Sequence, residues 1–128
     1  MRAFVFWSGV YNLVFGMGLF FPALGRAVGI RQPDSVFFSE LIALLVVFLG
    51  VLLILCSRNL AARASLVYWI GVLLVVAFIH QAWFGFFRAH GAMVGVSGLI
   101  DLAIGLGYLL GLPKSLGRSH SQLLCDRA

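Results

Sequence analysis

Charged residues are scarce in this sequence. Only 10% of its 128 residues are Asp, Glu, Lys or Arg, whereas a soluble domain carries about a quarter. Apolar residues make up 62% of the chain, and the mean hydropathy is +1.09. Since this leaves too little polar surface to cover a water-soluble globule, we expect an integral membrane protein whose first partner is the lipid bilayer.

The sequence also lacks the common motifs of catalysis and metal binding. We find no Ser-His-Asp arrangement, no Gly-rich phosphate loop and no zinc spacing, so we name no catalytic residue and no metal ligand. The two cysteines, Cys56 and Cys125, have no C-x-x-C partner and fall on the side predicted below to be cytoplasmic, where reducing conditions argue against a disulfide. Basic residues are scattered rather than clustered, which excludes a nucleic-acid face.

Four apolar segments are long enough to cross a hydrocarbon core of about 30 Å as helices, which takes about 20 residues. They are residues 3–21, 36–56, 64–87 and 93–112. None alternates like a barrel strand, so helices are expected. The sequence therefore predicts an all-α, four-helix transmembrane bundle over 1–112 and a polar, mobile tail over 113–128. Two short connections predict that the second helix neighbours the third, and the third the fourth.

Lys and Arg residues are distributed unequally between the two sides of this bundle. Six fall on the side of the termini, and three on the other side. The first group is Arg2, Arg58, Arg63, Lys114, Arg118 and Arg127; the second is Arg26, Arg31 and Arg88. Because cytoplasmic loops carry an excess of Lys and Arg, we expect both termini of this multi-pass protein to be cytoplasmic.

The first and fourth segments share an ungapped pattern, G-x-x-[N/D]-L-x-x-G-x-G, over 9–18 and 98–107. The two helices cross in opposite directions, so the pattern places Asn12 and Asp101 near the membrane midplane. We expect the glycines to let these helices pack together, with Asn12 and Asp101 facing each other. The alternative is a chance match in a chain rich in Gly and Leu.

Asp101 is the only acid deep inside a predicted span, and a charge at that depth costs about 2.5–3.5 kcal/mol on insertion scales. Ser97 and Tyr108 extend a polar stripe along the same helix, and Asn12 or Tyr11 could donate to the carboxyl group. Asp101 is therefore either a proton- or ligand-handling acid or a hydrogen-bonded packing residue.

Three further residues are candidates for a polar site near the outer face. His80 is either a packed residue or a hydrogen-bond donor to a quinone-type ligand. Glu40 suits the first turn of its helix because of the helix dipole, but it could also converge with His80 to line a cavity above Asp101. Trp83 belongs to an aromatic belt or to an aromatic ligand site.

The layout resembles the small four-helix bacterial membrane proteins grouped as DoxX-like. The features that carry the resemblance are Phe20-Phe21-Pro22 at the end of the first helix, the Ser57-Arg58-Asn59 turn and Asp101 in the fourth helix. Relatives in that group include membrane subunits of quinone-linked sulfur oxidation. The resemblance implies a four-helix bundle of the bacterial inner membrane and a quinone or other apolar ligand, and it transfers no catalytic residue.

Three functions are compatible with the sequence. Because few polar side chains lie within the predicted spans, a non-enzymatic accessory or interaction subunit is favoured, with a membrane protein partner or a second copy of the chain. The alternatives are a membrane subunit that binds a quinone or other apolar ligand, and a small proton-coupled transporter that uses Asp101.

Overall fold

The computed structural model describes residues 1–27, 36–88 and 92–126, and within these ranges it contains helices and no strand. The elements are α1 (Arg2–Leu19), α2 (Pro22–Ala27), α3 (Val36–Arg58), α4 (Ala64–Ala82), the π-helix η1 (Trp83–Phe87), α5 (Ala92–Leu116) and α6 (His120–Leu124). The predicted all-α fold is confirmed. Three helical stretches in this part of the chain are long and apolar enough to cross a membrane: α3, α4 with η1, and α5.

Helix α1 is the fourth long helix, and it is less apolar than the other three. It has 18 residues, but it includes Arg2 and Asn12, whose side chains lower its hydropathy. Helix α1 therefore stands outside the three stretches that are long and apolar enough to cross a membrane.

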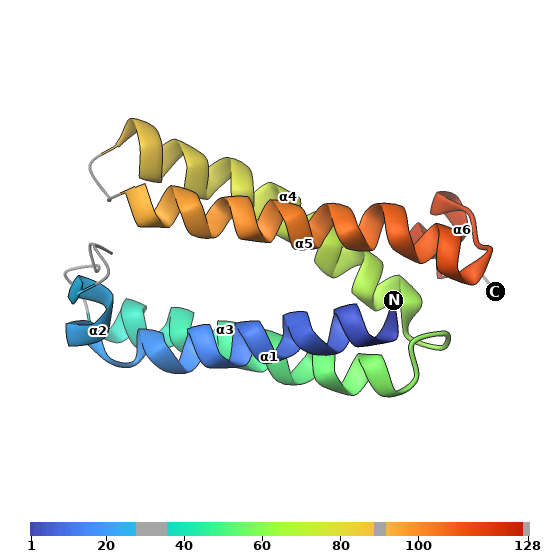
Figure 1. The fold of residues 1–128 in the computed structure, drawn as a ribbon, viewed down its shortest axis with the longest axis horizontal. Helices are drawn as coiled ribbons and strands as arrows, with labels where there is room; N and C mark the ends of the chain where they lie inside the picture. Colours follow the sequence, from blue (N-terminus) through green and yellow to red (C-terminus); the bar gives the residue numbers. More distant parts are fainter. Residues whose placement is uncertain (28–35, 89–91, 127–128) are drawn as a thin grey trace.

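The long helices form two hairpins (Figure 1). Helix α1 packs along α3, and α4 packs along α5, while α3 contacts α4 only beside their short connection. The predicted pairing of the third and fourth helices is thus confirmed. The predicted pairing of the second and third long helices is wrong. Helix α3 packs along α1 instead, because the two backbones can come closest there.

Glycines set that close approach between α1 and α3. A Cβ atom on Gly50 would lie 2.6 Å from the Leu13 backbone nitrogen and 2.7 Å from the Gly9 carbonyl oxygen. Gly16 meets α3 in the same way, since its Cβ would lie 2.8 Å from the Val47 backbone nitrogen. No side chain fits at these positions, which explains the glycines in otherwise apolar helices.

Glycines also allow close backbone contact between the helices of the second hairpin. A Cβ on Gly105 would lie 2.8 Å from the Gly71 carbonyl oxygen, and a Cβ on Gly85 would lie 2.7 Å from the Gly95 Cα. Gly85 lies in η1, where wider π-helical turns replace the α-helix. The motif glycines Gly9, Gly16 and Gly105 therefore pack within their own hairpins, whereas Gly107 faces the Phe4 ring of α1. The predicted packing of the first helix on the fourth through motif glycines holds only at Gly107.

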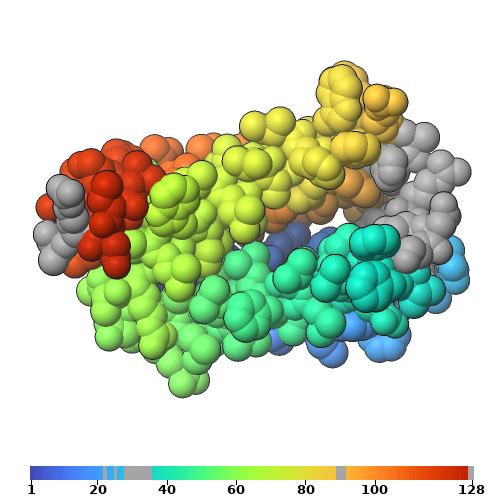
Figure 2. All heavy atoms as spheres, turned by 180° about the vertical axis from the view of Figure 1, so that it is seen from behind, coloured from blue at the N-terminus to red at the C-terminus, as the bar shows by residue number. Residues whose placement is uncertain are grey.

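The two hairpins meet at the end of the molecule that holds the N-terminus and α6 (Figure 1). The buried core lies there and includes Val5, Leu53, Val67, Tyr108 and Leu112. Away from this end the hairpins diverge, and Figure 2 shows a hollow between α3, in green to cyan, and α4, in yellow-green to yellow.

The tail is part of this core, so the prediction of a mobile polar segment over 113–128 is wrong for its described residues. Ser119 caps α6 in a capping box with Gln122, and Leu123 is 0% exposed. The Tyr68 hydroxyl lies 2.7 Å from His120 Nδ1, and Trp69 Nε1 donates to the Leu124 carbonyl at 3.1 Å.

Pro22 and Pro113 do not end the first and fourth long helices. Helix α1 ends at Leu19, and Pro22 begins α2, a position that proline favours because its missing N–H has no partner in a first turn. Pro113 lies inside α5, which ends at Leu116. Gly117 then adopts a left-handed conformation with φ +63, and the Arg118 N–H donates to the Pro113 carbonyl at 3.3 Å, a glycine-dependent helix stop.

Candidate intramembrane polar site

A hydrogen-bonded chain of three side chains connects the end of α4 to the first half of α5. Gln81 Nε2 donates to Asp101 Oδ2 at 2.7 Å, and the Ser97 hydroxyl donates to Gln81 Oε1 at 2.7 Å. Gly98 makes room for this arrangement, because a Cβ there would lie 2.9 Å from the Gln81 Cβ. All three side chains are half-buried. Within the described residues, Asp101 Oδ1 has no hydrogen-bond partner.

The face of α5 that carries Asp101 is the face turned toward α1. Tyr108 follows Asp101 by about two helical turns, so the two side chains share one side of α5. The Tyr108 hydroxyl, which is fully buried, shares a short hydrogen bond with the Ser8 hydroxyl of α1. The Phe4 ring of α1 packs edge-on against Tyr108 with centroids 5.6 Å apart, and it fills the space beside Gly107.

Tyr11 and Phe15 follow Ser8 at successive turns of α1, so they lie along the same side of that helix. Since α1 and α5 run in opposite directions (Figure 1), these two rings come opposite the stretch of α5 that holds Asp101. The rings of Tyr11 and Phe15 are stacked, with centroids 5.9 Å apart and planes inclined by 17°.

Asn12 hydrogen-bonds within its own helix. Its side chain is only 4% exposed, and its Nδ2 donates to the Ser8 carbonyl of its own helix at 2.8 Å. In the part of the chain that the structure describes, no hydrogen bond joins Asn12 to Asp101. Asn12 follows Ser8 by one helical turn, and its amide donates back to the Ser8 carbonyl rather than across to α5.

The outer candidates lie apart from this chain. His80 is exposed, and its ring lies on Phe84 with centroids 4.6 Å apart. Trp83 is 53% exposed and packs against Phe87 and the Arg88 guanidinium. Glu40 is exposed in the first turns of α3. Across the described ranges, no hydrogen bond or ion pair joins Glu40, His80 and Asp101, so the predicted convergence into one cavity is not formed.

No group of three or more His, Cys, Asp or Glu side chains in the described ranges could hold a metal ion. Cys56 is buried and Cys125 is exposed, and both are free thiols. The chemistry available at the polar site is therefore hydrogen bonding: a carboxyl oxygen, an amide and a hydroxyl on one side, and the tyrosine hydroxyl with two stacked rings on the other.

Sequence reasoning missed Gln81 as a member of this site. It follows His80 and precedes an aromatic run, and nothing in its neighbours signals a role. A usable signal was spacing: Ser97 and Asp101 are one turn apart on one helix, so they can share a single long polar side chain from the next helix.

No protein-family model matches this chain, and searches of curated proteins and of solved structures found no match either. The resemblance to DoxX-like proteins is therefore neither supported nor refuted, and the function must be argued from the site.

Proposed function

We propose that this protein is a small integral membrane protein, with no enzymatic activity of its own, that binds an apolar ring-bearing molecule between its two helical hairpins. A quinone is the candidate ligand class. In this proposal α1 is the fourth membrane crossing, the membrane is the bacterial inner membrane, and both termini are cytoplasmic. The Lys and Arg distribution supports that orientation, and the N-terminus and α6 lie at one end of the molecule.

One arrangement carries the proposal: the Ser97–Gln81–Asp101 chain and the stacked rings of Tyr11 and Phe15 follow, on antiparallel helices, the contact between Ser8 and Tyr108. This register directs the rings toward the stretch of α5 that holds Asp101. Polar groups at membrane depth are costly and mark functional sites by default. Ligand sites in membranes and elsewhere combine apolar or aromatic walls with a few placed polar groups. The space between the hairpins offers both.

The residues present fit a quinone-type head group. Gln81 Nε2 has a second N–H beyond the one that Asp101 accepts, and the Tyr11 hydroxyl is a further donor, so two donors are available to ring carbonyl oxygens. Asp101 Oδ1 could accept from a hydroxylated ring. When bound, a quinone would supply redox chemistry; the residues of this chain would bind its head group and keep its ring between apolar side chains.

The test is to identify what co-purifies with the protein from its own membrane. Wild-type protein, Asp101→Leu and the control Glu40→Gln are purified in mild detergent, and bound small molecules are extracted and identified by mass spectrometry. We expect a ring-bearing apolar molecule in the wild type and in Glu40→Gln, because Glu40 is an exposed acid outside the site. Asp101→Leu should lose it.

Other outcomes would contradict ligand binding. If no such molecule is found and a second membrane protein co-purifies in constant ratio, the accessory-subunit function is favoured instead. Asp101→Asn addresses the transporter alternative, since an Asn side chain can still accept from Gln81 but cannot carry a proton. Ligand retained in Asp101→Asn supports hydrogen bonding, whereas loss of a proton-coupled flux in that variant would support transport.

A further inference from the structure

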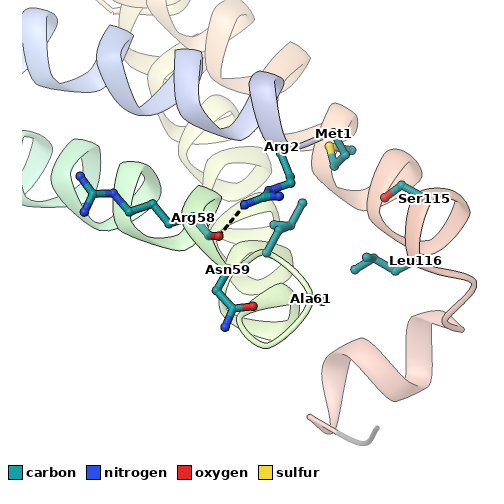
Figure 3. Close-up of a pocket in the computed structure, with 8 residues that line it drawn as sticks. Met1, Arg2, Arg58, Asn59, Ala61, Ser115 and Leu116 are labelled. Atoms are coloured by element: carbon teal, nitrogen blue, oxygen red, sulfur yellow. Dashed lines mark hydrogen bonds between the residues drawn. The ribbon is translucent and has the colours of Figure 1, made fainter.

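A second candidate site lies at the C-terminal end of α5, away from the polar chain of Ser97, Gln81 and Asp101. Here the start of α1, the connection between α3 and α4, and the end of α5 enclose a pocket of about 480 Å³. Its lining residues are Met1, Arg2, Arg58, Asn59, Leu60, Ala61, Ser115 and Leu116 (Figure 3).

The Arg2 side chain points into this region and only part of its hydrogen-bonding capacity is used. Its Nε donates to the Ser57 carbonyl at 3.1 Å, and its Nη2 donates to the Arg58 carbonyl at 2.6 Å. These bonds fix the guanidinium at the C-terminus of α3, where a cation suits the helix dipole. A guanidinium has five N–H donors, so three remain for an acceptor from outside the described chain.

The surrounding charge is strongly one-sided. The described residues at this end of the molecule carry five basic side chains: Arg2, Arg58, Arg63, Lys114 and Arg118. Asp126 is the one acidic side chain among the described residues there. One of these cations, Arg63, is committed to the Leu55 carbonyl, and Arg58 turns its side chain away from the pocket (Figure 3), which leaves Arg2 as the cation within it.

The pocket also has an apolar part. Met1, Leu60 and Leu116 line it together with Arg2 and the Ser115 hydroxyl, and the Leu116 side chain points toward it (Figure 3). A free phosphate has no use for an apolar wall, whereas a phospholipid brings a phosphate and acyl chains together. Basic pockets between transmembrane helices on the cytoplasmic side suit anionic lipid head groups, and the arginine fork matches a phosphate.

We propose that this pocket binds the phosphate group of an anionic phospholipid, with Arg2 as its charged donor and the acyl chains lying along Met1, Leu60 and Leu116. Ser115, whose hydroxyl donates to the Leu112 carbonyl at 3.3 Å, lines the pocket beside the phosphate position. The site is separate from the polar chain around Asp101, so it does not depend on the ligand proposed there.

The experiment measures lipid retention by native mass spectrometry. The full chain is reconstituted with equal amounts of phosphatidylglycerol and phosphatidylcholine, transferred to detergent and analysed for bound lipid. We expect the wild type to retain one phosphatidylglycerol in preference to phosphatidylcholine. Arg2→Gln should abolish this preference, whereas Arg88→Gln, which removes an exposed arginine at the other end, should leave it unchanged.

Because Arg2 also caps α3, a second variant avoids that contact. Ser115→Glu places a negative charge in the pocket and should abolish the preference, while Ser121→Glu places the same charge on exposed α6 as the matched control. Equal retention of both lipids by the wild type, or unchanged preference in Ser115→Glu, would overturn the proposal. Competition by millimolar inorganic phosphate would also overturn it, in favour of a free anion as ligand; retention despite phosphate supports the lipid.

Discussion

The contact between α1 and α3 makes a quantitative prediction for Gly50→Ala. The added methyl group would lie 2.6 Å from the Leu13 nitrogen and 2.7 Å from the Gly9 oxygen. Both neighbours are backbone atoms that no side-chain rotation can move. To restore a contact of about 3.4 Å or more, the helices must separate by roughly 0.8 Å, and overpacking of this kind costs about 1–3 kcal/mol.

Gly18→Ala is the matched control in the same hairpin. Its added methyl group would meet only the Leu24 side chain, at 3.5 Å, which is an ordinary contact. Replacing glycine by alanine in a helix otherwise stabilises by about 0.5–1 kcal/mol, so the control should unfold at the wild-type temperature or slightly above it.

The assay is thermal unfolding in detergent followed by the fluorescence of the 3 tryptophans. We expect the unfolding midpoint of Gly50→Ala to fall by several degrees relative to both the wild type and Gly18→Ala. A midpoint for Gly50→Ala equal to or above that of Gly18→Ala would refute the backbone contact between α1 and α3, and with it the assignment of helices to hairpins.

Three further predictions concern packing and are measured by the same unfolding assay. Tyr108→Phe should cost about 0.5–1.5 kcal/mol, the net value of a hydrogen bond, because the Ser8 hydroxyl keeps carbonyl partners in its own helix. Leu123→Ala should cost about 2–5 kcal/mol, since this side chain of α6 is fully buried. Gly85→Ala should destabilise the second hairpin by about 1–3 kcal/mol, because its added methyl group would meet the Gly95 backbone.

Each of these changes has a control or a contradicting result. Leu124→Ala, on the exposed side of α6, should be close to neutral, and equal losses for the two leucines would mean that α6 does not dock. A larger loss for Tyr108→Phe than for Leu123→Ala would contradict the minor role given to the hydroxyl pair. An unchanged midpoint for Gly85→Ala would contradict the crossing of η1 and α5.

The four long helices could be predicted from composition alone, because a bilayer requires long apolar stretches with internal hydrogen bonds. Their pairing could not. Short connections favour neighbours in sequence, yet α3 packs on α1, since the steric match of Gly50 to Gly9 and Leu13 depends on helix rotation. Hydropathy does not encode that rotation.

The polar site could be predicted in part. Asp101 stands out because it is an acid in an apolar segment, and Ser97 is correctly placed on the same stripe, since both side chains bind Gln81. Asn12 is equivalent to Asp101 in the repeat, but its amide donates to the Ser8 carbonyl of its own helix, a choice of partner that the sequence pattern does not encode. Glu40 and His80 share an end of the molecule with no contact, because their helices belong to different hairpins.

The central claim is that a ring-bearing apolar molecule binds between the hairpins at Asp101. The most direct test titrates a short-chain quinone onto the protein in nanodiscs and follows tryptophan fluorescence. Saturable quenching by the wild type and Glu40→Gln is predicted, with affinity up to about tenfold weaker in Asp101→Leu, because Asp101 orients the Gln81 amide that donates to the ring and a lost hydrogen bond costs about 0.5–1.5 kcal/mol. Identical titration curves for all three proteins would contradict the claim.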